Sequence, residues 1–294
     1  KHPFAKSVER GLRYLKTIQD PEGCLGTRTS PNFIYNHAMG TIALVEAYGM
    51  TESPILKGAA QRAIDFSAAA RNPYFGWRYG VRPGDNDTSV THWMLMGIHR
   101  AKAINDQAKT DGRPAPFTID DGAFDGALAW IEKMTDSDYG RVGYISRGSG
   151  PARPMELIDR FPGEKSESMT AAGIHIRLMA GENAKRSAVI KKGVELMTAL
   201  PPSWNVADGS IDMYYWTIGT SVMAQVGGRR WKRWAGRLLD ATVPWQRRDT
   251  DHCGYRGSWD PVGSWGLDGG RVYSTAMMTI ALGTWLNAHR TGVR

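Results

Sequence analysis

The segment His37-Ala38-Met39-Gly40-Thr41-Ile42-Ala43-Leu44 returns near the other end of the chain as Thr275-Ala276-Met277-Met278-Thr279-Ile280-Ala281-Leu282, with six of the eight positions identical. Three segments of similar character lie between these two copies and begin at Thr88, Ser168 and Thr217. A pattern that recurs along a chain indicates a repeat architecture. We therefore interpret the five segments as the same element of five repeats.

A second helical pattern precedes each recurring segment. Its apolar residues are spaced i, i+4 and i+7, which places them on one face of a helix. The patterns are Val8, Leu12 and Leu15; Phe124, Leu128 and Ile131; Ile190, Val194 and Met197; Trp231, Ala235 and Leu238; and an alanine-rich equivalent over residues 55 to 70. These helices carry many charges and should form an outer layer, whereas the nearly uncharged recurring segments should lie inside. The sequence predicts inner helices that begin near residues 36, 88, 168, 215 and 274, with the Gly/Pro/Arg-rich stretch 146–165 as an insertion.

The composition is that of an ordinary globular protein. Of 294 residues, 41% are hydrophobic and 22% are charged, and no apolar run of about 18 residues would span a bilayer. The repeats favour a single domain over residues 1–294. The first residues, Lys1-His2-Pro3-Phe4, lack an initiator Met and a signal-peptide core, so an origin in a longer chain and the cellular compartment both stay open.

The net charge of +8 suits an acidic partner. Its densest basic segment runs from Arg229 to Arg237 and contains Trp231 and Trp234. One interpretation is an amphipathic helix that contacts an anionic membrane surface; the other is a solvated outer face whose tryptophans pack inward. Nucleic acid is not expected as a partner, because no recognised binding motif accompanies the charge.

The loops after the outer helices share a second signature. Gln19 and Gly23 follow the first outer helix, Gly76-Trp77 occupies the matching place in the second repeat, and Gln246 with Gly257-Ser258-Trp259 does so in the last. A Gln can bond the orphan groups of a helix end, a Gly permits a left-handed exit, and a Trp covers a large apolar area. These residues should fasten each loop to its own hairpin.

Helical repeats with such loops resemble the α-toroid repeats of squalene cyclases and protein prenyltransferase β subunits. The resemblance covers nearly the whole chain and is closest to the bacterial prenyltransferase/squalene oxidase repeat proteins. The segments that carry it are Gly76-Trp77-Arg78-Tyr79, Asp87-Thr88-Ser89-Val90-Thr91-His92-Trp93, Tyr214-Tyr215-Trp216 and Gly257-Ser258-Trp259-Asp260-Pro261. The resemblance implies an all-α fold, an α/α toroid of about five helical hairpins whose inner helices line a central funnel.

Two carboxylates at the start of an inner helix are candidate catalytic residues. Class II terpene cyclases carry Asp-x-Asp-Asp at such a place, where one acid protonates an alkene. When the final Asp-Thr of that motif is aligned with Asp87-Thr88, the position of the proton donor falls on Asn86. An amide cannot donate a strongly acidic proton, so catalysis would need Asp85 or Asp87 to replace it. The alternative is that Asp87 caps the inner helix by accepting its unpaired N–H groups.

Asp251, His252 and Cys253 are weak candidates for a metal site. Zinc prenyltransferases use these residue types, but their Asp-x-Cys begins an inner helix, and consecutive residues rarely point at one tetrahedral centre. We expect no metal and no cofactor. Cys24 and Cys253 occupy corresponding loops of the first and last hairpins, and the sequence leaves open whether they form a disulfide, which requires Cα atoms about 4.4–6.8 Å apart.

Aromatic residues gather where loops meet inner helices and predict a binding site at one mouth of the funnel. The candidate ligand-binding residues are Tyr35, His37, Trp77, Tyr79, Trp93, Tyr214, Tyr215, Trp216 and Tyr273. The leading hypothesis is a noncatalytic or weakly catalytic binding module that takes an isoprenoid or lipid chain in the funnel or a protein segment at its mouth. The alternatives are a class II terpene cyclase that uses Asp85 or Asp87, and a scaffold domain of a larger cell-envelope protein.

Overall fold

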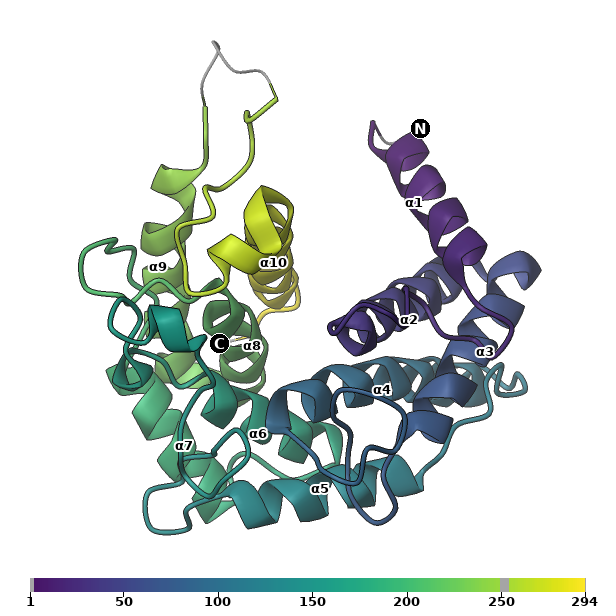
Figure 1. Ribbon diagram of the computed structural model, residues 1–294, viewed down its shortest axis with the longest axis horizontal. Coiled ribbons are helices and arrows are strands. Elements are labelled where there is room, and N and C mark those ends of the chain that lie inside the picture. Colours follow the sequence, from purple (N-terminus) through teal and green to yellow (C-terminus); the bar gives the residue numbers. More distant parts are fainter. Residues whose placement is uncertain (1–2, 249–253, 294) are drawn as a thin grey trace. The chain divides into compact units, whose positions relative to one another are not determined.

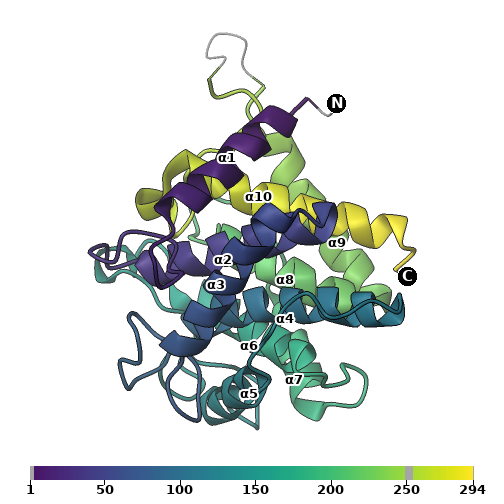
Figure 2. The same cartoon turned by 90° about the vertical axis from the view of Figure 1, so that its right-hand side faces the viewer.

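The computed structural model describes residues 3–248 and 254–293 (Figures 1 and 2). Every regular secondary-structure element within these ranges is helical, which confirms the all-α fold class. They are α1 (Ala5–Ile18), α2 (Phe33–Thr51), α3 (Pro54–Ala70), α4 (Thr88–Thr110), α5 (Gly122–Met134), α6 (Ser168–Met179), α7 (Ala188–Ala199), α8 (Met213–Val226), α9 (Gly228–Thr242) and α10 (Gly266–Arg290), with short 3₁₀ turns η1 (Met155–Leu157), η2 (Gly163–Lys165) and η3 (Val243–Trp245).

The ten helices alternate between outer and inner ones, as the repeats predict. The inner helices α2, α4, α6 and α8 begin within three residues of their predicted starts. The last inner helix, α10, begins earlier than predicted, because a first turn from Gly266 is joined to the main helix across Gly270. Gly270 has φ of 60°, a left-handed conformation that glycine adopts without strain.

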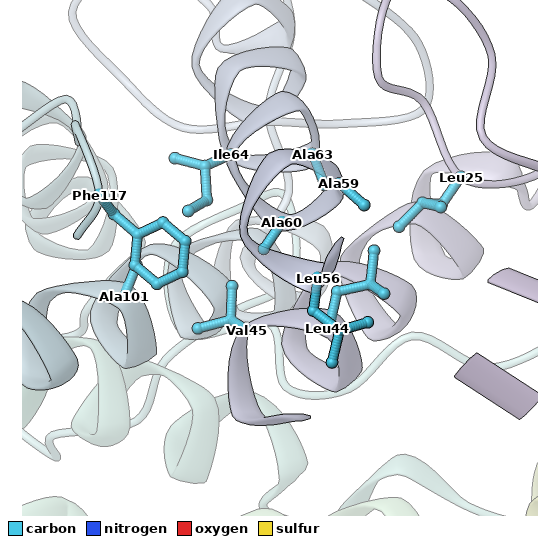
Figure 3. Packing of buried hydrophobic residues seen from close by; sticks show 10 residues of the cluster. All are labelled: Leu25, Leu44, Val45, Leu56, Ala59, Ala60, Ala63, Ile64, Ala101 and Phe117. Carbon is cyan, nitrogen blue, oxygen red and sulfur yellow. The ribbon is translucent and has the colours of Figure 1, made fainter. Parts of the chain in front are cut away.

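The chain divides into two compact units, residues 1–132 and 133–294. In the first unit α2 packs against both α3 and α4. Small alanines on α3, among them Ala60 and Ala63, allow its backbone to approach Leu44 and Val45 of α2, and Phe117 closes the cluster (Figure 3). Burial of this apolar surface is the main driving force for the folding of the unit.

In the second unit α8 packs against α6, α9 and α10. The outer helix α9 buries Trp231 and Trp234. Trp234 donates its indole N–H to Oγ1 of Thr220 at 3.0 Å, and its ring lies so close to Gly219 that a Cβ there would come within 2.5 Å of Cζ2. A side chain at position 219 would therefore displace the tryptophan.

Equivalent tryptophans fasten the loops of two repeats in the same way. The indole N–H of Trp77 donates to the Ser67 carbonyl at 2.7 Å, and its backbone N–H donates to Thr91 Oγ1 at 3.1 Å. Trp259 makes the matching bonds to the Thr242 carbonyl at 2.8 Å and to Thr275 Oγ1 at 3.3 Å. Each loop is thus bonded to both helices of its own hairpin, which confirms the fastening role predicted for the loops that contain Trp77 and Trp259.

The near-identity of the two copies predicts that matching residues, such as Met39 and Met277, lie on equivalent faces, but in the structure the copies bury different sides of their helices. Ala38 of α2 is buried and Met39 is exposed, whereas on α10 Ala276 is exposed and Met277 is buried. The reason is the neighbour of each helix: Thr41 of α2 lies against Gly97 of α4, and the backbone of Met277 accepts a hydrogen bond from Thr217 of α8. Helix α2 is therefore covered by the repeat that follows it, and α10 by the repeat that precedes it.

The first outer helix differs from the others. The predicted stripe of α1 forms, but none of its residues is buried, and Val8 is 57% exposed. Outer helices α3 and α9 pack mainly on the inner helix that comes before them, α2 and α8 respectively. Leu12 and Leu15 of α1 are half-buried and pack on the core cluster that contains Leu25 and Leu44, so the stripe is covered in its C-terminal part and open at Val8.

Candidate functional site

Most of the predicted aromatic site residues are part of the cores of the two units. Trp77 is fully buried and Trp93 nearly so. In the second unit Tyr215 and Trp216 are also fully buried, and the Tyr215 hydroxyl donates to the Leu200 carbonyl at 2.8 Å. Burial, with smaller contributions from Glu167 and Asp212, raises the pKa of Tyr215 well above its usual value. These side chains hold the helices together.

Two accessible tyrosines meet where the first turn of α2, which holds Tyr35, approaches the α3–α4 loop, which holds Tyr79. The rings of Tyr35 and Tyr79 meet edge to face with centroids 5.8 Å apart. Their hydroxyls are 3.4 Å apart, and the Tyr35 hydroxyl also donates to Ser89 Oγ at 3.0 Å. Tyr79 is 40% exposed, and the Arg78 guanidinium lies 6.0 Å from its ring centroid. This part of the first unit offers a ligand both aromatic faces and hydroxyl groups.

The candidate carboxylates have other tasks in the structure. Asp87 is buried and its side chain accepts a hydrogen bond from the Val90 N–H at 2.7 Å, which confirms that it caps α4. Asp85 is exposed and forms an ion pair with Arg78 at 2.7 Å. Asn86, at the place of the cyclase proton donor, is buried and accepts a hydrogen bond from Asn72.

His37 is buried and hydrogen-bonded through both ring nitrogens. Nδ1 accepts the Leu25 backbone N–H at 3.1 Å, so Nε2 carries the proton and faces Ser67 Oγ at 2.9 Å. Burial lowers the pKa of His37 to about 3. The ring is therefore neutral at physiological pH and joins the first loop to α2 and α3.

A buried ion pair in the second unit was not predicted from the sequence. Arg153 and Asp212 meet at 2.8 Å, with only 4% and 1% of their side chains exposed. The same Asp212 oxygen accepts a hydrogen bond from Ser166, and the other caps α8 through the Tyr215 N–H. Asp212 stands directly before an apolar inner helix, as Asp87 does, and that position could have identified it as a cap. Nothing in the sequence of the insertion 146–165 indicated which of its arginines would be buried.

Two tyrosines lie beside this ion pair. Burial raises the pKa of Tyr273 well above its usual value, and the negative charge of Asp212 and the neighbouring Tyr214 add to the shift, while Arg153 opposes it. Tyr273 therefore stays a neutral phenol throughout the physiological pH range. Tyr214 is buried and Tyr273 is half-buried. A neutral phenol in this environment can donate a hydrogen bond but cannot act as a base.

The structure contains a groove of about 730 Å³ between α1 and α2, lined by both apolar and uncharged polar residues. Its walls come from these two helices and from the loop that joins them. The lining residues are Tyr14, Leu15, Ile18, Gly26, Thr27, Asn36, Met39, Gly40 and Ala43. None of these side chains is charged, and the size falls within the usual range of small-molecule sites, about 300–1,000 Å³. The groove lies within the first unit alone.

The metal candidates Asp251, His252 and Cys253 lie outside the described residues. In the described part of the chain, no three His, Cys, Asp or Glu side chains are grouped so as to hold a metal ion. The helices that the structure describes also include none long and apolar enough to cross a membrane.

No protein-family model matches this chain, and no curated protein matches it either.

Proposed function

We propose that this protein is a noncatalytic binding module that holds an uncharged isoprenoid or other lipid chain in the groove between α1 and α2. The observation that carries the proposal is the groove itself, whose lining includes the apolar side chains of Leu15, Ile18 and Met39. Apolar walls favour a hydrocarbon chain, because burying its surface releases water. The absence of charge among the lining residues argues against a diphosphate group, which would need cations or backbone N–H groups.

The polar residues of the groove can orient such a chain. Tyr14, Thr27 and Asn36 offer two hydroxyls and an amide, which suit an alcohol or carbonyl at one end of a lipid. A few polar groups among apolar walls are the usual composition of a ligand pocket. We therefore expect a polyisoprenoid alcohol or a fatty acyl derivative to bind better than a bare hydrocarbon of the same length.

The noncatalytic part of the proposal rests on the carboxylates. Asp87 accepts a hydrogen bond from the α4 backbone and Asp85 pairs with Arg78. Alkene protonation needs a carboxylic acid that is protonated and preorganised in an apolar cavity. An exposed, ion-paired Asp85 is poorly suited to that task, so binding is favoured over the class II cyclase alternative.

Native mass spectrometry of the purified protein, followed by solvent extraction, tests the proposal directly. A retained polyisoprenoid or acyl lipid is expected, and a wholly empty protein would favour a scaffold role. Equilibrium dialysis with tritiated farnesol should then show weaker binding by Ala43→Trp, which fills the groove, and unchanged binding by Met50→Trp, which lies on the same helix outside it. Equal effects of both substitutions would exclude the groove as the site.

We also propose that the five hairpins close into an α/α toroid. The support is a difference in buried faces: Ala38 is buried on α2 while the matching Ala276 is exposed on α10, and Met277 is buried on α10 while the matching Met39 is exposed on α2. In a closed ring each inner helix has a neighbour on both sides, so exposed residues such as Ala276 of α10 and Val8 of α1 would be covered. Such burial is favourable by roughly 25 cal/mol per Å² of apolar surface.

Cross-linking tests the closure. In a background with both cysteines changed to serine, Met39→Cys combined with Ala276→Cys should react within one chain with a short bismaleimide. Met39→Cys combined with Tyr139→Cys, whose native tyrosine is also exposed, serves as the control. Equal yields for the two pairs, or cross-links only between chains, would contradict a closed ring.

A second candidate ligand is a protein segment at Tyr35 and Tyr79. The observation that favours it is the exposure of Tyr79 next to Arg78 and Asp85, because aromatic hydroxyls flanked by charges are typical of protein interfaces. Peptides selected from a random library on the wild-type protein should lose binding to Tyr79→Ala and keep it with Tyr74→Ala, a more exposed tyrosine on the same loop. Loss in both variants would argue against a site at Tyr79.

A further inference from the structure

The outer helix α9 has two chemically different sides. Trp231, Trp234 and Leu238 are buried against the rest of the second unit. Arg229, Lys232, Arg233 and Arg237 are exposed. At 100° per residue these four cations fall within an arc of about 140° centred opposite the buried tryptophans. The sequence alternative of a solvated face with inward tryptophans is thus confirmed for the fold, and the tryptophans of α9 are unavailable to a membrane.

The four exposed cations have no carboxylate partner within the described ranges. Arg230, the fifth cation of the helix, pairs with Glu195 of α7 at 3.3 Å. Asp240 is the single acidic residue of α9. A row of unpaired like charges repels itself, so it is favourable only when an anionic partner or counterions neutralise it.

An exposed apolar turn follows the cationic row. Helix α9 runs directly into Val243, which has helical backbone angles and is 42% exposed. Trp245 is 47% exposed, and its ring stacks on Trp204 with centroids 5.2 Å apart. From Arg229 to Val243 the face is about 21 Å long at 1.5 Å per residue. Cations together with an accessible tryptophan and aliphatic side chains are the combination found at membrane interfaces.

We propose that this face, Arg229, Lys232, Arg233 and Arg237 with Val243 and Trp245, docks the protein on an anionic lipid bilayer. The cations would contact the headgroups, and Val243 and Trp245 would enter the interfacial region. The apolar turn is what favours a bilayer over an acidic polypeptide, because a polypeptide would require no such residues. This docking does not depend on a chain in the α1–α2 groove, and vesicle binding and farnesol binding are separate measurements.

Vesicle co-sedimentation tests the docking face. The protein should bind phosphatidylcholine vesicles that contain 30% phosphatidylglycerol, bind pure phosphatidylcholine vesicles far more weakly, and dissociate as salt rises. Each Lys or Arg near an anionic surface contributes a factor of about five to binding. Lys232→Gln/Arg233→Gln/Arg237→Gln should therefore lower the partition coefficient roughly 100-fold.

A matched control separates this face from net charge. Lys6→Gln/Arg13→Gln/Lys16→Gln removes the same charge from exposed positions of α1 and should leave vesicle binding within about twofold, because the proposal assigns the binding to the α9 cations and not to the net charge. Val243→Ser should weaken the binding that remains at high salt. The proposal would be overturned if both triple variants lost vesicle binding equally, or if the protein showed no preference for anionic vesicles. It would also be overturned if α9 were needed for binding to polyglutamate while the protein did not bind vesicles.

Discussion

Removing one partner of the Arg153–Asp212 pair should destabilise the second unit far more than removing both. Each side chain is almost completely buried, and the pair meets at 2.8 Å. Arg153→Met leaves the Asp212 carboxylate without its cation, and Asp212→Asn leaves a buried guanidinium without its anion. Breaking a buried pair in this way costs about 3–5 kcal/mol, mostly because the remaining charge is desolvated and uncompensated.

The double variant Arg153→Met/Asp212→Asn removes both charges and keeps a capping side chain, since Asn caps helices as well as Asp does. Buried ion pairs replaced by neutral groups of similar volume often leave stability little changed. We therefore expect the double variant to be more stable than either single variant. The coupling free energy between the two positions should be at least about 2 kcal/mol.

Urea unfolding followed by circular dichroism at 222 nm measures these differences, provided that the m-value does not change. Arg230→Met, which breaks the exposed pair with Glu195, is the control and should cost no more than about 1 kcal/mol. If the single variants lost less than about 1 kcal/mol, or if their losses simply added in the double variant, the buried pair would not act as a unit and our reasoning would be wrong.

Three further predictions follow from the first unit. Asp87→Asn should be nearly neutral and Asp87→Ala should cost roughly 0.5–2 kcal/mol in urea unfolding, whereas a cyclised polyene formed by wild type and lost in Asp87→Asn would restore the cyclase alternative. The folded-state pKa of His37 is about 3, below its unfolded value near 6.5. The contribution of the neutral ring to the unfolding free energy is therefore complete above pH 6.5 and is lost as pH falls toward 3. His37→Gln should reduce the difference in unfolding free energy between pH 7 and pH 5 by roughly 2 kcal/mol. Burial and the charge of Asp20 raise the pKa of the Cys24 thiol to about 11, so this thiol should react with Ellman's reagent at pH 8 only after unfolding. Rapid labelling of Cys24 in the native protein would contradict its burial. Two titratable thiols after denaturation without reductant would exclude a bond to Cys253.

The alternation of inner and outer helices could be predicted because it depends on local patterns. Apolar spacing and the near absence of charge in segments such as Thr88–Ile98 fix which helices are buried, whatever packs on them. The fastening role of the loop tryptophans could be predicted for the same reason, since Trp77 and Trp259 bond to residues of their own hairpins. The role of Asp87 as a cap was likewise readable from its place before an apolar helix.

The site was harder to predict because its properties depend on which side of each helix faces a neighbour. The sequence placed Trp77, Trp93 and Trp216 at a ligand-binding mouth, but aromatic residues that bury a core and those that bind a ligand have the same composition signal. Only the packing showed that these three are buried while Tyr79 is exposed. The groove was not foreseen, because its walls combine residues of α1 and α2 whose spacing is also that of an ordinary core.

Local patterns were enough to predict the helices, their order along the chain and which of them are mostly buried, because periodicity and capping act over a few residues of one chain segment. The remaining features depend on the tertiary packing. It paired Arg153 with Asp212 across 59 positions of sequence. It covered Leu12 and Leu15 of α1 but left Val8 exposed, and it gave the similar segments of α2 and α10 different buried faces. These outcomes depend on which elements become neighbours, and burial, unlike helix formation, is a property of neighbours in space.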